Sequence, residues 1–83
     1  MYELVSFVVR SKTRKLVLEQ LKEPKTPTQV SHILRLHRSS VSRTILSLEK
    51  KGLVECLTPN EKMGRFYGIT KIGVEVLNKI RRE

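Results

Sequence analysis

The sequence predicts a mainly helical α+β domain in which a three-helix core is followed by a β-hairpin and a C-terminal helix. Up to residue 51 the apolar residues recur at intervals of three and four, which is typical of amphipathic helices. Two short apolar runs separated by turn residues come next, and helical spacing returns after Thr70. A chain of 83 residues can form one small core, so we expect a single domain over residues 1–83.

The amino-terminal part predicts two short helices. Residues 2–9 carry apolar side chains at helical spacing, but some of them also alternate as in a strand, and of the two readings we favour a short helix. The next helix is expected over residues 11–22, because Ser11 is a suitable N-cap, the apolar residues recur at helical intervals, and Pro24 prevents continuation.

Two more helices are expected within a few residues of each other. Thr26 is a good N-cap, and Pro27 fits the first helical position, where its missing N–H costs nothing. The apolar stripe of this helix is Val30, Ile33 and Leu34. The pattern stops near Arg35, and another helix follows over residues 38–51, closed by Gly52 in the left-handed region. Its expected inward-facing residues are Val41, Ile45 and Leu48.

After Gly52 the pattern predicts a hairpin and a last helix. The apolar runs 53–57 and 65–69 read as strands, and the turn residues between them are Thr58, Pro59, Asn60 and Gly64. Cys56 lies in the first run and is expected to be a small core residue. Thr70 caps the last helix, whose buried face is predicted to contain Ile72, Val76 and Ile80 with Leu77 beside them, while Gly73 weakens the helix.

Charge is the first indication of function. The chain has 17 Lys and Arg against 8 acidic residues, all Glu, and a formal net charge of +9. Residues 10–51 hold eleven of the basic residues, and no acidic residue occurs between Glu23 and Glu49. The expected partner is therefore a polyanion that contacts this part of the chain.

Several other functions are disfavoured by the residues present. Cys56 is the only cysteine, so it can form no intramolecular disulfide, although an exposed thiol could link two copies. His32 and His37 are five residues apart, whereas two metal ligands on one face of a helix are four apart, and a third ligand is lacking. We therefore expect no metal and no cofactor. No triad or glycine-rich phosphate loop is visible, and we expect no enzyme. The apolar runs are too short to span a membrane, and we expect a cytoplasmic protein.

Two short helices joined by a tight turn form a helix-turn-helix, whose second helix enters the major groove of DNA. Such a helix needs a slim outer face that can form hydrogen bonds. The helix over 38–51 offers small hydroxyls for close approach and Arg for guanine or phosphate. The DNA-binding candidates on it are Arg38, Ser39, Ser40, Ser42, Arg43 and Ser47.

Over residues 11–78 the chain resembles small archaeal and other prokaryotic winged-helix regulators of the MarR and ArsR type. The residues that carry the resemblance are Pro27-Thr28-Gln29-Val30, Ser39-Ser40-Val41-Ser42-Arg43, Glu49-Lys50-Lys51-Gly52-Leu53-Val54, Gly64-Arg65-Phe66-Tyr67 and Ile69-Thr70. The resemblance implies a recognition helix at about 38–51 and a wing at about 58–65, from which Lys62 and Arg65 reach phosphates or the minor groove. It also implies that Thr28 and Gln29 donate to the DNA backbone.

The chain departs from this family pattern at the turn between the two helices. Arg35 stands where a glycine is usual, and a non-glycine residue in the left-handed region is mildly strained, so a local change of the turn is expected. His37 stands where Ser or Thr usually caps the recognition helix, and Ser39 is the alternative cap. The longer effector-sensing and dimerising helices of such families are not found in these residues.

The leading hypothesis is a transcription regulator that binds double-stranded DNA as a homodimer. The expected dimer surface is the last helix together with the apolar amino-terminal segment of Leu4, Val5, Val8 and Val9, and burial in the chain's own core is the competing explanation for that segment. Two alternatives stay open: a winged-helix protein-interaction module within a transcription or other assembly, and a structured-RNA binder.

Overall fold

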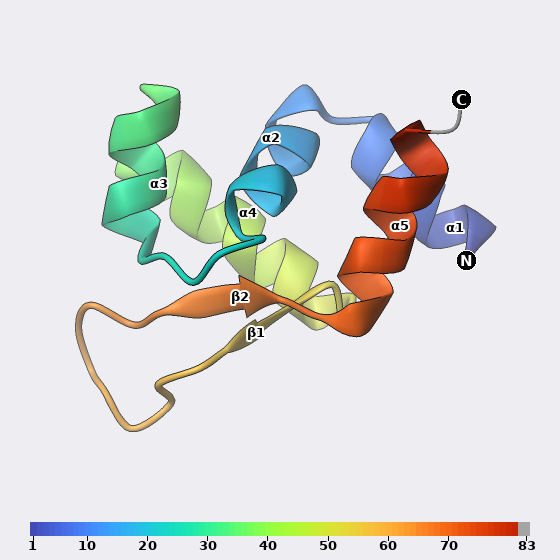
Figure 1. Ribbon diagram of the computed structural model, residues 1–83. Helices are drawn as coiled ribbons and strands as arrows, with labels where there is room; N and C mark the ends of the chain where they lie inside the picture. The colour runs from blue at the N-terminus through green and yellow to red at the C-terminus, as the bar shows by residue number, and fades with distance from the viewer. Residues whose placement is uncertain (82–83) are drawn as a thin grey trace.

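The computed structural model describes residues 1–81 and has the predicted order of elements (Figure 1). The described chain contains five helices and two strands. Their bounds are α1 (Tyr2–Val9), α2 (Lys12–Gln20), α3 (Pro27–Leu34), α4 (Arg38–Lys50), β1 (Val54–Cys56), β2 (Tyr67–Ile69) and α5 (Lys71–Arg81). The mainly helical α+β class, with a hairpin and a last helix after the helical core, is confirmed.

Helix starts follow the hydroxyl residues that the sequence indicates. Ser11 Oγ accepts the Arg14 N–H at 3.3 Å at the start of α2. Thr26 and Gln29 form a capping box on α3, in which each side chain accepts the backbone N–H of the other residue, at 3.2 Å for Thr26 Oγ1 and 2.9 Å for Gln29 Oε1. Thr70 Oγ1 accepts the Gly73 N–H at 3.1 Å at the start of α5. The predicted caps of α2, α3 and α5 are confirmed.

The turn between α3 and α4 does not change to avoid strain. Arg35 adopts the left-handed conformation, with φ 56° and ψ 44°, and the next residue, Leu36, donates its N–H to the Ser31 carbonyl at 3.0 Å. His37 is the N-cap of α4, and no side chain caps this helix. Ser39 lies inside the helix, so the prediction that it serves as the cap is wrong.

A single hydrophobic core joins all five helices to the hairpin. It includes Val5 and Val8 of α1, which are 9% and 0% exposed. The prediction that these two valines face a partner copy is therefore wrong, because α1 packs them against the chain's own core. Leu4 is half-buried and Val9 is 53% exposed, so only the outer side of α1 is accessible.

In α3 and α5 the predicted apolar stripe is buried only in part. In α3 the buried residues are Val30 and Ser31, while Ile33 is 52% exposed. Ser31 tolerates burial because its hydroxyl donates to the Thr28 carbonyl at 2.8 Å. In α5 the buried residues are Gly73, Val76 and Leu77, whereas Ile72, expected to be buried, is 45% exposed.

The two strands are antiparallel and pair Val54 with Ile69, Glu55 with Gly68, and Cys56 with Tyr67. They are shorter than the runs 53–57 and 65–69. Beyond Cys56 and Tyr67, the Phe66 carbonyl still accepts the Leu57 N–H at 2.7 Å, but the Phe66 N–H is donated to the Thr58 hydroxyl at 2.9 Å. Tyr67 also exchanges backbone hydrogen bonds with Lys25, at 2.9 and 3.1 Å. The hairpin is thereby attached to the segment that leads into α3.

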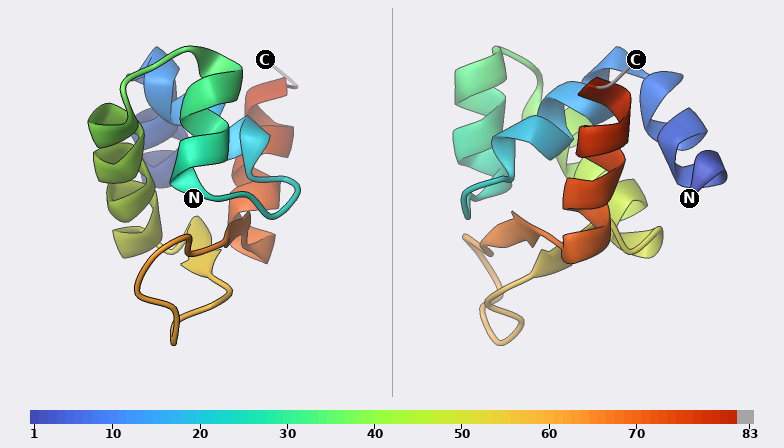
Figure 2. Two further views of the ribbon diagram at one scale, coloured as in Figure 1. Left: turned by 90° about the vertical axis from the view of Figure 1, so that its left-hand side faces the viewer. Right: turned by 45° about the vertical axis from the view of Figure 1, so that its right-hand side comes forward.

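The elements separate into two ends of the molecule. α3 and α4 lie side by side at one end, and the long loop of the hairpin projects below them (Figures 1 and 2). α1 and α5 pack together at the other end. The helix-turn-helix and the hairpin loop are therefore accessible from the same end, away from α1.

Candidate nucleic-acid interface

Helix α4 buries one side and presents a polar side. Val41, Ile45 and Leu48 are at most 1% exposed, which confirms the predicted inner face. Four of the six sequence-predicted candidates on α4, Arg38, Ser39, Arg43 and Ser47, are exposed; the other two, Ser40 and Ser42, are half-buried at the edges of that face. The outer surface of α4 thus carries guanidinium and hydroxyl groups, as a helix in a major groove requires.

Two exposed residues on the same face were missed by the sequence reasoning. Leu46 is 55% exposed and Lys50 is exposed, and they follow Arg43 at three and seven residues. Residues at this spacing share one side of a helix. The helical spacing from Arg43 was the signal that could have found them.

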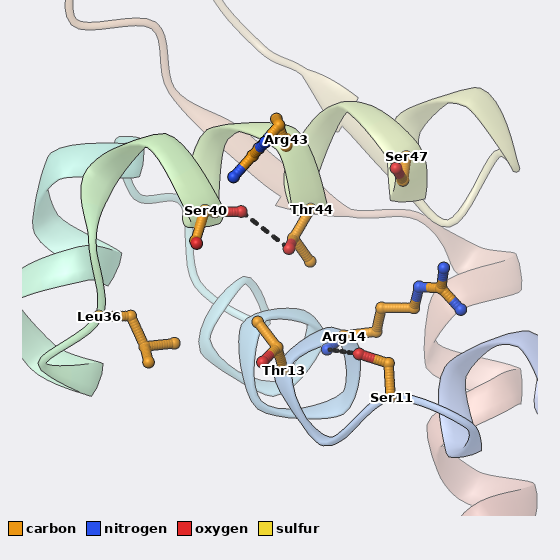
Figure 3. Close-up of a pocket in the computed structure, with 8 residues that line it drawn as sticks. All are labelled: Ser11, Thr13, Arg14, Leu36, Ser40, Arg43, Thr44 and Ser47. Carbon is orange, nitrogen blue, oxygen red and sulfur yellow. Dashed lines mark hydrogen bonds between the residues drawn. The ribbon is translucent and has the colours of Figure 1, made fainter.

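A polar cleft of about 340 Å³ lies between α2 and α4 (Figure 3). Five hydroxyl residues line it together with Leu36 and two arginines: Ser11, Thr13, Arg14, Ser40, Arg43, Thr44 and Ser47. Ser40 and Thr44 point from α4 toward α2, and the Thr44 hydroxyl donates to the Ser40 carbonyl at 2.9 Å. The cleft brings three predicted residues together, Ser40, Arg43 and Ser47, and adds Thr13, which the sequence did not single out.

Not every basic residue of this region is directed outward. The Arg14 guanidinium lies 3.8 Å from the centroid of the Phe7 ring and donates to the Phe7 carbonyl at 2.8 Å. The Lys51 ammonium lies 5.3 Å from the same ring centroid. These cation–π contacts attach α1 to α2 and to the end of α4. The charge of Arg14 and Lys51 is therefore partly used within the fold.

Thr28 and Gln29 lie in the exposed first turn of α3. They line a shallow depression with Glu23, Lys25 and His32, separate from the α2–α4 cleft. The side-chain oxygen of Gln29, Oε1, accepts a hydrogen bond in the capping box. The side-chain nitrogen, Nε2, takes no part in the box and can donate to another group. The structure thus does not bring these two residues into the same cleft as Arg43.

The wing, residues 58–65, lies in the loop between β1 and β2. Lys62 and Arg65 are exposed on it, and Arg65 Nε donates to the Glu61 carbonyl within the loop. Gly64 turns the chain at φ 66°. A guanidinium has five N–H donors, so Arg65 retains donors for an anion after this contact. Lys62 and Arg65 form a third group, apart from the cleft and from the start of α3.

The described residues contain neither a metal-binding cluster nor a membrane-spanning helix. Within residues 1–81 no three His, Cys, Asp or Glu side chains are grouped so that they could hold a metal ion. Cys56 is half-buried and packs against the core. No helix in the described part of the chain has the length and apolar character needed to cross a membrane.

Comparison with known proteins gives matches at the level of structure only. No protein-family model matches the chain, and no curated protein matches it. Among solved structures, the transcriptional regulator Tm0710 from Thermotoga maritima is 25% identical with a TM-score of 0.77, over 94% of this chain. The MarR family transcription regulator SP03579 is 23% identical with a TM-score of 0.77, over 98% of this chain.

A third similar structure is a complex of S. aureus MepR with DNA, which is 17% identical with a TM-score of 0.76 over 87% of this chain. The chain covers 60%, 60% and 62% of the lengths of Tm0710, SP03579 and MepR. Tm0710 and SP03579 are transcription regulators by name, and MepR is in a complex with DNA. The chain therefore has the winged-helix fold found in MarR-family transcription regulators.

Proposed function

We propose that this chain is a winged-helix domain, spanning residues 1–83, that binds double-stranded DNA and regulates transcription without catalytic activity. The observation that carries the proposal is the outer face of α4, where the exposed side chains are basic, hydroxyl or apolar and the nearest acid, Glu49, is half-buried at its end. Carboxylates there would repel phosphates, whereas Lys and Arg displace the counterions of DNA and gain affinity. The likeness to MepR, a structure with DNA, supports this function.

In this proposal α4 is the recognition helix, over about 38–51, and lies in the major groove. Arg43 is at the centre of the exposed face and reads a guanine or holds a phosphate, while Arg38 in the first turn holds a phosphate. The hydroxyls of Ser39, Ser40, Ser42 and Ser47 keep the face slim. Because no side chain caps α4, its first N–H groups are also available to a phosphate oxygen.

Two further elements would hold the DNA backbone. Thr28 and Gln29 at the start of α3 donate to one phosphate strand, Thr28 by its hydroxyl and Gln29 by the amide nitrogen that the capping box leaves free. The wing at 58–65 contributes Lys62 and Arg65 to phosphates or the adjacent minor groove. These contacts set the orientation of α4, and α4 supplies the sequence preference.

We also propose that two copies form a homodimer. Tyr2 is 85% exposed and Val9 is 53% exposed on the outer side of α1, and Val74 of α5 is 41% exposed. These apolar groups, with half-buried Leu4, replace Val5 and Val8 as the candidate interface. Two recognition helices would then bind half-sites about 34–36 Å apart, the length of one turn of DNA.

Other parts of the sequence hypothesis stay predictions: a cytoplasmic location, no cofactor, an archaeal source and a likeness to ArsR-type regulators. The two alternative functions also remain. A protein-interaction module would use the basic face without DNA, and a structured-RNA binder would prefer an RNA helix.

The decisive experiment is selection of bound sequences from a random duplex DNA library, followed by binding measurements across a salt series. We expect an enriched inverted repeat and an affinity that falls steeply as salt rises. Duplex RNA is measured in parallel. Preference for RNA would favour the RNA binder, and absent or salt-insensitive DNA binding would favour the interaction module.

A further inference from the structure

Leu46 is an apolar side chain on the outer face of α4. It is 55% exposed, while its neighbour Ile45 is 1% exposed and belongs to the core. Leu46 follows Arg43 by three residues and precedes Lys50 by four, and all three are exposed. Because such spacing keeps side chains on one side of a helix, Leu46 lies between two cations on the face assigned to DNA.

Exposure of a single leucine has no meaning by itself, because isolated apolar side chains are common on protein surfaces. The position of Leu46 matters because of what it would meet in a major groove. When the face of α4 closes on DNA, water leaves the side chain, and the floor of the groove takes its place. That floor consists of hydrogen-bond donors and acceptors, with one apolar group, the C5 methyl of thymine.

A leucine pressed against the polar edge of a base pair leaves donors or acceptors unpaired, which is unfavourable. Against a thymine methyl the same leucine removes apolar surface from water on both sides. Leu46 therefore has little effect in the free protein, but in the complex it favours a base pair with a thymine methyl over one that presents only polar groups. Arg43 cannot supply this preference, because its guanidinium matches guanine or phosphate.

We propose that Leu46 determines specificity by contacting the C5 methyl of a thymine in each half-site. This inference rests on the proposed function, since it requires α4 in the major groove. The rise along a helix separates Arg43 from Leu46 by about 4.5 Å and base pairs are about 3.4 Å apart. The thymine is therefore expected one or two base pairs from the base or phosphate that Arg43 contacts.

The test replaces single thymines of the selected duplex by deoxyuridine, which pairs identically and lacks only the methyl group. We expect one thymine in each half-site at which this change weakens wild-type binding by about fourfold, the equivalent of one buried CH₂ group. The variant Leu46→Ala is expected to bind the thymine duplex less tightly and to bind both duplexes equally. Ile33→Ala, which truncates an apolar residue of 52% exposure on α3, serves as the matched control and should keep the fourfold preference.

The outcomes separate this inference from the function on which it rests. Tight, salt-dependent binding that ignores every thymine methyl, or an unchanged preference in Leu46→Ala, would overturn the role of Leu46 and leave DNA binding intact. Absence of binding to any duplex would overturn both. Circular dichroism of Leu46→Ala checks that the exposed substitution leaves the fold unchanged.

Discussion

The backbone of Gly73 lies directly against the carbonyl oxygen of Leu53. A β carbon at residue 73 would lie under 3.0 Å from that oxygen and 2.6 Å from Cγ1 of Ile69. The Leu53 carbonyl is itself fixed, because it accepts the Thr70 N–H at 3.0 Å. The start of α5 can therefore approach the end of α4 and the hairpin this closely only with glycine at position 73.

Gly73→Ala is expected to destabilise the protein although alanine is the better helix former. The propensity gain is about 1 kcal/mol, and the clash with Leu53 and Ile69 is expected to cost about 1–3 kcal/mol beyond that gain. Urea denaturation followed by circular dichroism measures the difference. Asn78→Ala, on the exposed side of the same helix, is the control and should not lose stability. A stabilised Gly73→Ala variant would show that α5 can move away from Leu53.

This glycine illustrates where prediction from sequence stopped. From the sequence, Gly73 is expected only to weaken the helix, and Ile72 is expected on the buried face. Val76 and Leu77 are buried as expected, but in the first turn of α5 Gly73 is buried and Ile72 is exposed. Gly73 takes the inner position because only glycine fits against Leu53. Caps and turns were predictable because they are local, whereas the choice between adjacent stripes depends on a partner distant in sequence.

In the candidate site, too, the features set by local sequence were predictable and those set by distant contacts were not. The inner stripe of α4 was predictable because Val41, Ile45 and Leu48 recur at strict intervals, and it fixes which side is outward. Leu46 was not predicted as a site residue because, unlike those of the arginines and serines of α4, its side chain forms no hydrogen bonds. The use of Arg14 within the fold was not predictable, because its contact with Phe7 depends on the packing of α1.

Arg35 provides a second test of stability. It is the one non-glycine residue with positive φ among the described residues, at 56°. A residue with a β carbon in the left-handed region destabilises the folded state by about 1–2 kcal/mol. Glycine removes this strain, but it also gives the unfolded chain more conformational freedom, which offsets part of the gain. Arg35→Gly is therefore expected to raise the free energy of unfolding by about 0.5–1 kcal/mol.

The matched control for Arg35→Gly is Arg10→Gly, which removes the same side chain from the end of α1 at φ −69°. Glycine gives no relief there and is expected to lower stability by up to about 1 kcal/mol. Thermal and urea unfolding of both variants measure the contrast. Equal effects of the two substitutions would mean that the turn at Arg35 stores no strain.

Two threonines two residues apart at the start of α3 are expected to have different roles. Thr26 caps the helix through the Gln29 N–H at 3.2 Å, so Thr26→Ala should cost about 1 kcal/mol of stability. Thr28 is exposed, and Thr28→Ala should change stability by less than about 0.5 kcal/mol. DNA binding by Thr26→Ala and Thr28→Ala is then measured under conditions in which both variants are fully folded. If Thr28 donates to a phosphate, only Thr28→Ala binds DNA more weakly. The reverse pattern would remove Thr28 from the interface.

The last prediction separates base reading from phosphate binding. Arg43→Ala is expected to cost about 1–3 kcal/mol at the selected site and to relax the preference at one base pair. Lys62→Ala, on the wing, should weaken all sequences alike and reduce the slope of log affinity against log salt by about 0.9, the value for one phosphate contact. Lys79→Ala, exposed on α5 away from the proposed DNA-binding face, is the control and should change neither quantity. Binding by Arg43→Ala and Lys62→Ala that equals the wild type would mean that another face of the molecule meets the DNA.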